Sequence, residues 1–228
     1  MNKKKIFSAI TCTAILLTAT NALSTPSSNP VKTGDTVYFT FGDNGGNGGG
    51  EFNVFVNNSS SSLFQTFCLE YNEHISLGSG NTYTVQGIST AAKNGGVDGS
   101  TNGEDPISEQ TAFLYHNFYW GTLKGYYYSG SGTNADSLLN ASNSAKALQE
   151  AFWYFENERA LTTLSQYFVD LANYAIDNDL WTGLGDVRVM NLGSAQDQLT
   201  VVPEPTTMLL FGTGLVGFAG IARRRMRS

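Results

Sequence analysis

Cys68 is the residue of this sequence with the most distinctive chemistry. The other cysteine, Cys12, lies in an N-terminal segment that we expect to be removed, which leaves Cys68 without an internal disulfide partner. The histidines His74 and His116 lack the spacing of a metal-binding or catalytic motif, so we expect each to be a packed or surface side chain. Cys68 is therefore either a functional thiol or an inert buried one.

Motifs for phosphate, metals or cofactors are not predicted. The glycine-rich stretch 45–50 lacks the lysine and the strand–loop–helix context of a P-loop, so we expect a plain loop. Asp177 and Asp179 lack the spacing of an EF-hand or RTX calcium site. We expect no cofactor and no metal, and we assign no catalytic residue.

Two short strings surround Cys68 and a distant glutamine, Gln149. Cys68 stands in the string FCL, and Gln149 stands in the string LQEAFW. Both strings resemble the motif pair in the thioester domains of bacterial surface adhesins. The resemblance implies a thioester crosslink between Cys68 and Gln149, formed when the thiolate attacks the carboxamide and ammonia leaves. The carbonyl carbon of such a thioester is an electrophile.

Gln149 is the glutamine that fits this pairing best. At helical spacing Leu148 and Phe152 share an apolar face that we expect to pack in the core, and this holds Gln149 at the helix edge near a packed strand. Gln110 fits poorly because it follows the charged Glu109. The alternative interpretation is an inert buried cysteine and a surface glutamine on a core helix.

The elements that position these residues begin with β-strands. Residues 36–41 and 52–56 alternate apolar and polar side chains on either side of a Gly/Asn loop, which predicts a hairpin. Further strands are predicted over 63–71, which includes Cys68, over 83–88, and over 187–192.

Helical spacing replaces this alternation from residue 106 onward. Ser108 is the predicted N-cap of a first amphipathic helix, and further helices are predicted over 143–157, which includes Gln149, and 162–178. A helical block inserted between strands predicts an α+β domain with an antiparallel, β-barrel-like sheet over residues 30–202.

The N-terminal segment 1–24 is predicted to be a signal peptide. Three lysines precede an apolar run, and small residues follow at Ala22 and Ser24. An uncleaved anchor is the alternative, but the apolar run is short and a mostly polar stretch follows it.

The C-terminal tail 203–228 combines a Pro-Glu-Pro triplet, an apolar stretch and an arginine cluster. The stretch is just long enough to span a bilayer as a helix, and the arginines are expected to remain cytoplasmic as a membrane stop. This order resembles the PEP-CTERM sorting signal, and the strings FCLE, AFLYHNFYWGTL, LQEAFWYFENE and VRVMNL are similar to PEP-CTERM proteins with thioester domains. The triplet and the cluster consist of Pro203, Glu204, Pro205, Arg223, Arg224 and Arg225.

The sorting resemblance implies recognition by an exosortase in a Gram-negative bacterium that makes extracellular polysaccharide. It further implies an inner-membrane intermediate, loss of the tail, and release or attachment at the surface. The region between the termini is strongly acidic, because all 19 acidic residues lie between Asp35 and Glu204 while most of the 13 basic ones are terminal. Nucleic acid is therefore not an expected partner.

Covalent adhesion is the function that these features predict. An amine or hydroxyl of a partner, either exopolysaccharide or protein, would attack the thioester once, so the protein would not be an enzyme. A noncovalent matrix protein is the alternative, and a secreted hydrolase is a third class. The aromatic residues considered for sugar stacking in the matrix alternative are Trp120, Tyr126, Tyr127, Tyr128 and Trp181.

Overall fold

The computed structural model describes residues 31–46, 49–93, 95–128, 139, 141–193 and 195–202. The predicted signal peptide, the Pro-Glu-Pro triplet and the arginine cluster lie outside the described residues. Within the described part of the chain, no helix is both long enough and apolar enough to cross a membrane.

Four strands form the first antiparallel sheet in the order β3-β2-β1-β4. Val37 and Phe39 point to the buried face of β1, and Phe39 lies opposite Val54 of β2. The predicted alternation of this hairpin is therefore confirmed. The strands are β1 (Thr36–Phe41), β2 (Phe52–Val56), β3 (Phe64–Thr66) and β4 (Tyr83–Thr84).

Five more strands form two smaller antiparallel sheets, β5-β8-β9 and β6-β7. A bridge between Cys68 and Gln198 joins the chain after β3 to the start of β9. The described strands do not close into a barrel, because β3 and β4 end the first sheet without pairing to each other. The barrel-like part of the prediction is wrong. The strands are β5 (Gly87–Ser89), β6 (Ala91–Lys93), β7 (Glu104–Pro106), β8 (Val187–Asn191) and β9 (Gln198–Val201).

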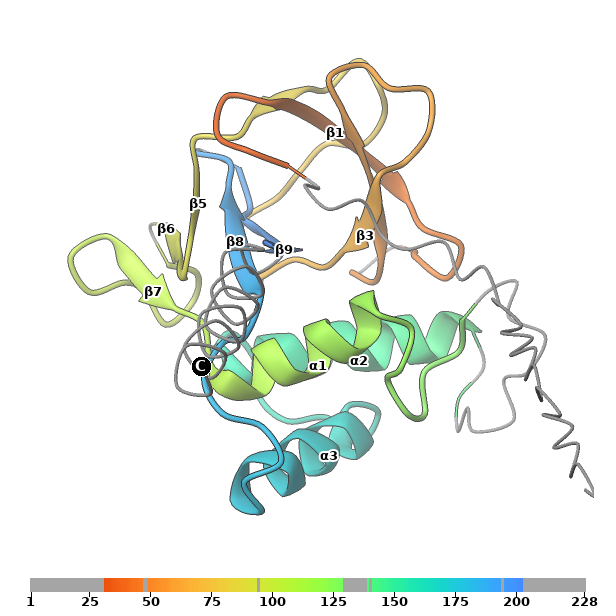
Figure 1. Ribbon diagram of the computed structural model, residues 1–228, viewed down its shortest axis with the longest axis vertical. Helices are drawn as coiled ribbons and strands as arrows, with labels where there is room; N and C mark the ends of the chain where they lie inside the picture. Colours follow the sequence, from red (N-terminus) through yellow and green to blue (C-terminus); the bar gives the residue numbers. More distant parts are fainter. Residues whose placement is uncertain are drawn as a thin grey trace, which may run out of the picture.

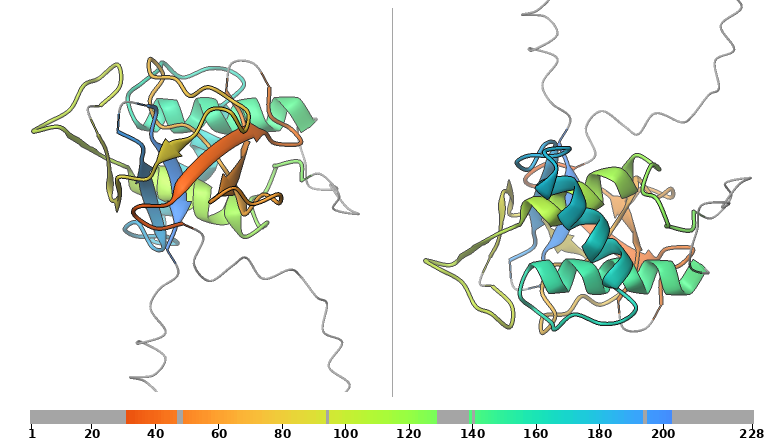
Figure 2. Two further views of the ribbon diagram at one scale, coloured as in Figure 1. Left: turned by 90° about the horizontal axis from the view of Figure 1, so that it is seen from above. Right: turned by 90° about the horizontal axis from the view of Figure 1, so that it is seen from below.

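In the described part of the chain, three helices form a layer on one side of the strands (Figure 1). The view from below in Figure 2 places α3 in front of α1 and α2. Ser108 caps α1 as predicted, since its hydroxyl accepts a hydrogen bond from the backbone N–H of Thr111. The helices are α1 (Glu109–Tyr119), α2 (Ala141–Phe155) and α3 (Gln166–Asp177). The predicted α+β class with an inserted helical block is confirmed.

The core of the described residues consists of two apolar clusters. The first, here called the helix cluster, lies between the helices and the strands β8 and β9, and includes Phe67, Leu148 and Phe152. The second, called the sheet cluster, lies against β1 and β2 and includes Cys68 and Trp153. Each cluster thus takes at least one side chain from the segment after β3 and at least one from α2.

The predicted strand over 63–71 is mostly wrong, because β3 ends at Thr66. Cys68 lies two residues beyond that strand, and its bridge to Gln198 replaces the expected ladder. The predicted strand over 83–88 is divided between β4 and β5, which belong to different sheets. Strands β6, β7 and β9 were not predicted because short strands carry little periodicity.

Candidate functional site

Cys68 is held by backbone contacts on both sides. The N–H of Leu199 donates to the carbonyl of Phe67, and the N–H of Leu69 donates to the carbonyl of Asp197. The ring of Phe67 packs edge-on against Phe118 and Phe152, with centroids 4.9 and 5.2 Å away.

Neighbouring residues in extended backbone point to opposite sides. With Phe67 in the helix cluster, the side chain of Cys68 therefore enters the sheet cluster. The anchoring of the phenylalanine thus fixes the direction of the cysteine.

Gln149 meets Cys68 through both ends of its carboxamide. Its Nε2 donates to the backbone carbonyl of Cys68 at 2.8 Å, and its Oε1 accepts from the backbone N–H of Cys68 at 3.1 Å. Leu148 and Phe152 are completely buried and hold this part of α2 in place. The two predicted site residues, 81 positions apart, are therefore brought together. Gln149 itself is completely buried, so the alternative of a surface glutamine is wrong.

The sulfur of Cys68 lies in the apolar sheet cluster, and among the described residues one side-chain donor reaches it. Burial raises the pKa of the Cys68 thiol to about 12, and a hydrogen bond from Gln198 partly opposes this shift. Gln198 Nε2 lies 3.6 Å from the sulfur, while Gln198 Oε1 has no partner among the described residues. A thiolate is costly at this position, whereas an acylated sulfur carries no charge to bury.

Gly49 covers the side chain of Gln149. Its φ is +99°, and a Cβ at this position would lie 2.6 Å from Cγ of Gln149 and 2.8 Å from the Trp153 ring. Only glycine allows the backbone to approach so closely in this conformation. The loop that was predicted as a plain connection is thus part of the site. The sequence carried a signal in its clustered glycines, although such stretches are common in loops.

A buried carboxyl pair supports the chain next to Cys68. Glu70 Oε2 accepts from the N–H of Asp197, whose own carboxylate accepts from the N–H groups of Leu192 and Lys93. Burial and the neighbouring Asp197 raise the pKa of Glu70 to about 9, so Glu70 is protonated at neutral pH. Sequence reasoning missed this pair, because nothing in the chain indicates that residues 70 and 197 meet.

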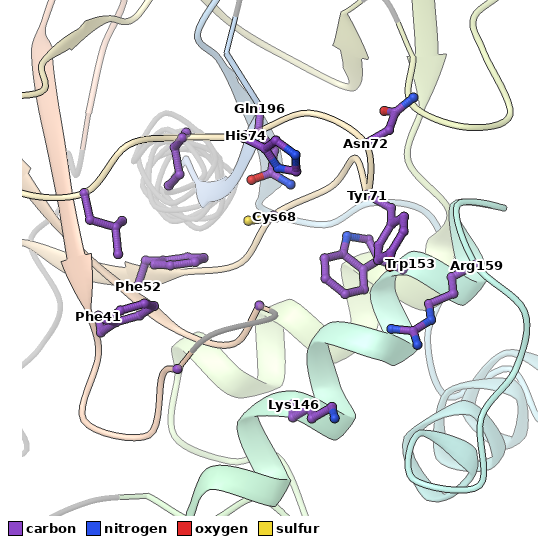
Figure 3. Close-up of a pocket in the computed structure, with 14 residues that line it drawn as sticks. Phe41, Phe52, Cys68, Tyr71, Asn72, His74, Lys146, Trp153, Arg159 and Gln196 are labelled. Atoms are coloured by element: carbon purple, nitrogen blue, oxygen red, sulfur yellow. The ribbon is translucent and has the colours of Figure 1, made fainter.

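A pocket of about 770 Å³ opens beside Cys68 (Figure 3). Phe41 and Phe52 lie on one side of it, and Tyr71 and Trp153 lie on the other, with the sulfur between them. By alternation, Phe41 lies on the same face of β1 as the buried Val37 and Phe39. It is nevertheless 42% exposed, because its ring reaches past the core into this pocket. Cys68 is only 3% exposed, so its side chain forms part of the pocket wall and is not open to solvent.

The two histidines occupy different places. His74 lines the pocket near Gln196 (Figure 3). His116 lies 2.6 Å from Asp186 through its Nδ1, and Trp120 donates to the other oxygen of that carboxylate. No group of His, Cys, Asp and Glu side chains that could hold a metal occurs in the described ranges, Asp177 and Asp179 included.

The aromatic residues considered for sugar stacking do not form a common surface. Tyr126 is 3% exposed and donates its hydroxyl proton to Glu51, so its ring is part of the core. Trp120 is 39% exposed, but its indole N–H is used by Asp186. Sugar stacking, which was considered for Trp120, Tyr126, Tyr127, Tyr128 and Trp181 only in the matrix alternative, is therefore excluded for Tyr126.

The chain is similar to one solved structure in its fold and to one known sorting motif in its sequence. The N-terminal domain of the Streptococcus pyogenes pilus tip adhesin Cpa is similar in structure, with a TM-score of 0.42 and 12% identity over 77% of this chain and 94% of that chain. No curated protein matches the sequence. Residues 201–225 match the PEP-CTERM protein-sorting motif, which includes the predicted triplet and arginine cluster. The chain carries a PEP-CTERM sorting motif, which implies an exported protein that is processed by an exosortase-type enzyme and sorted to the cell surface.

Proposed function

We propose that this domain forms an internal thioester between the sulfur of Cys68 and the side-chain carbonyl carbon of Gln149, and that it attaches covalently to a partner at the cell surface. The observation that carries the proposal is the pair of hydrogen bonds between the Gln149 carboxamide and the Cys68 backbone. They keep a buried amide against the residue that carries the thiol, with no other reaction partner required.

Thioester formation is a balanced exchange within the chain. The Cys68 sulfur attacks the carboxamide carbon of Gln149, the C–N bond breaks, and the nitrogen leaves as ammonia with the thiol proton. The product is neutral, which suits a site where burial raises the pKa of the thiol to about 12. Burial also protects the bond from hydrolysis until a partner enters.

Attachment reverses the bonding at sulfur, which becomes a thiol again. A hydroxyl or amine of the partner adds to the acyl carbon, the C–S bond breaks, and the proton of the nucleophile passes to the leaving sulfur. The partner is then joined to position 149 by an ester or amide bond. Each molecule reacts once, so the protein is a covalent binder and not an enzyme.

This chemistry fits a protein that works outside the cell. Export and surface sorting follow from the sorting motif. A covalent bond to a surface or matrix partner resists dilution and shear, as adhesion within a biofilm of a Gram-negative bacterium requires. The noncovalent matrix protein remains the competing proposal, in which Cys68 stays a free buried thiol.

Methylamine distinguishes the two proposals. It should add once to the purified wild-type domain and expose one thiol per chain at the same time. Cys68→Ala should abolish both effects. Gln149→Glu is the matched control, because it keeps the size of the side chain but offers no amide, and it should block addition while leaving the thiol free. Wild-type protein that takes up no methylamine and never exposes a thiol on treatment would contradict the proposal.

A further inference from the structure

The pocket beside Cys68 has the composition of a binding site for a particular class of nucleophile. Cys68 and Gly49 both line it, and both contact Gln149. The acyl carbon of the proposed thioester therefore lies just behind the pocket wall. A molecule bound in the pocket is the one that would react with the thioester. The residues that line the pocket therefore indicate the chemical class of this molecule.

The charged groups that reach the pocket are cationic. Lys146 and Arg159 line it, and their side chains are 54% and 38% exposed. Both share one counter-ion, Glu150, at 4.0 and 3.5 Å, and this carboxylate is only 5% exposed. None of the described lining residues is Asp or Glu. Two cations with one buried carboxylate leave positive charge facing the pocket, in a chain of formal net charge −6.

The neighbouring carboxylate of Glu158 does not cancel this charge at the pocket wall. Glu158 precedes Arg159, but its two oxygens accept hydrogen bonds from the backbone N–H groups of Tyr71 and Val97. It is 4% exposed and does not line the pocket. A bound anion would therefore meet the ammonium and guanidinium groups directly.

The other residues that line the pocket suit a ring that has apolar faces and polar groups around its edge. Phe41 and Tyr71 are 42% and 45% exposed on opposite sides of the pocket (Figure 3). Phe41 stacks on Phe52, and the guanidinium of Arg159 lies 5.3 Å from the centre of the Tyr71 ring, so a ligand ring would pack on the parts of the two rings that these neighbours leave exposed. Asn72, His74 and Gln196 add neutral hydrogen-bonding groups. The indole N–H of Trp153 is buried without a partner among the described residues. Sugars offer C–H faces for stacking and hydroxyls for such groups.

We infer that the pocket binds a sugar acid, and that a hydroxyl of this sugar is the nucleophile that the domain captures; the second half of this inference rests on the proposed thioester. The sugar carboxylate pairs with Arg159 and Lys146, and the ring lies between the aromatic side chains. The hydroxyl oxygen bonds to the acyl carbon of Gln149 as the C–S bond breaks. The hydroxyl proton passes to the Cys68 sulfur.

An acidic peptide fits these observations less well. Extended peptides bind by pairing with a free strand edge, and helical peptides need a long apolar groove. The strand residues of this pocket, Phe41 and Phe52, are paired with each other. A volume of about 770 Å³ lies within the range of small-ligand pockets.

Noncovalent binding is tested first, on Cys68→Ala protein, which cannot form a thioester. Digalacturonic acid is titrated by calorimetry beside its neutral counterpart galactobiose and a Glu-rich peptide. We expect the sugar acid to bind about tenfold more tightly than the neutral sugar. Adding Arg159→Gln or Lys146→Gln should remove most of this preference. Lys124→Gln, which changes an exposed lysine outside the pocket, should not.

The covalent step is tested on wild-type protein by intact mass. Digalacturonic acid should add one molecule per chain, and hydroxylamine should release it because the bond is an ester. If methylamine adds but the sugar acid neither binds nor adds, this inference is wrong while the thioester stands. If methylamine does not add, the thioester and the capture of a sugar hydroxyl are both rejected. Binding of the sugar acid to Cys68→Ala protein then still shows whether the pocket recognises this ligand. Tighter binding of the peptide than of the sugar acid would overturn the inference.

Discussion

The helix cluster and the sheet cluster receive neighbouring residues of the same two segments but differ in what surrounds them. Phe67 and Phe152 enter the helix cluster, where aromatic rings pack edge to face and are completely buried. Cys68 and Trp153 enter the sheet cluster, which borders an open pocket and buried polar groups. The helix cluster contributes stability, and it fixes the direction of the groups that the sheet cluster presents.

Replacing phenylalanine by alanine should affect stability more in the helix cluster than at the pocket that the sheet cluster borders. Phe67→Ala should lower the free energy of unfolding by about 3–5 kcal/mol, because it leaves a cavity among packed rings. Phe41→Ala should cost less than about 1 kcal/mol, since that ring is 42% exposed beside the pocket. Urea unfolding measures both. Similar losses would contradict the division between a structural and a functional side.

Two glycines test how closely the loop covers Gln149. Gly49→Ala should cost about 2–3 kcal/mol and block methylamine addition, because its Cβ would collide with Gln149 and Trp153. Gly78→Ala is the matched control. It has a similar φ of +96° but nothing within 4 Å, so only backbone strain of about 1–2 kcal/mol applies. Unfolding and methylamine uptake would be measured on both, and normal uptake by Gly49→Ala would remove the loop from the site.

The buried carboxyl beside Cys68 should make stability depend on pH. The pKa of Glu70 is raised from 4.5 to about 9, so the folded state holds a proton that the unfolded state has lost. This contribution is complete below pH 4.5 and is lost as pH rises toward 9. The free energy of unfolding of the wild-type protein should therefore fall between pH 5 and 9. We expect Glu70→Gln to reduce this fall by at least about 1 kcal/mol. Parallel curves for the two proteins, by urea unfolding at each pH, would contradict the assignment.

Gln198 should affect reaction rate more than stability. Its N–H points to the sulfur at 3.6 Å, and this sulfur becomes the leaving group when the thioester opens. Gln198→Met should therefore slow methylamine addition about tenfold. The free energy of unfolding should fall by only about 1 kcal/mol, because Oε1 of this buried amide lacks a partner among the described residues and the main hydrogen bond lost is the one from Nε2 to the carbonyl of Gln196. Unchanged kinetics would leave Gln198 with a packing role.

The sequence predicted the local parts of this site better than its surroundings. The helical spacing of Leu148 and Phe152 correctly placed Gln149 on a core-facing helix, and the alternation of Val37 and Phe39 correctly gave a buried strand face. These features depend on neighbours along the chain.

The surroundings of the site depend on contacts between distant segments. The bridge from Cys68 to Gln198 and the approach of Gly49 to Gln149 join residues far apart in sequence. No periodicity in the chain indicates either contact. The same reason explains why Cys68 was assigned to a regular strand, which instead ends at Thr66.

The intact mass of the rapidly purified mature domain tests the thioester most directly. The account predicts a mass below that of the sequence by one ammonia, with peptide mapping that assigns the loss to position 149 and finds Cys68 unreactive toward thiol reagents. Hydrolysis during handling would leave a carboxylate at position 149 and can be recognised by mapping. A chain of full sequence mass that retains the Gln149 amide and a free Cys68 thiol would contradict the account.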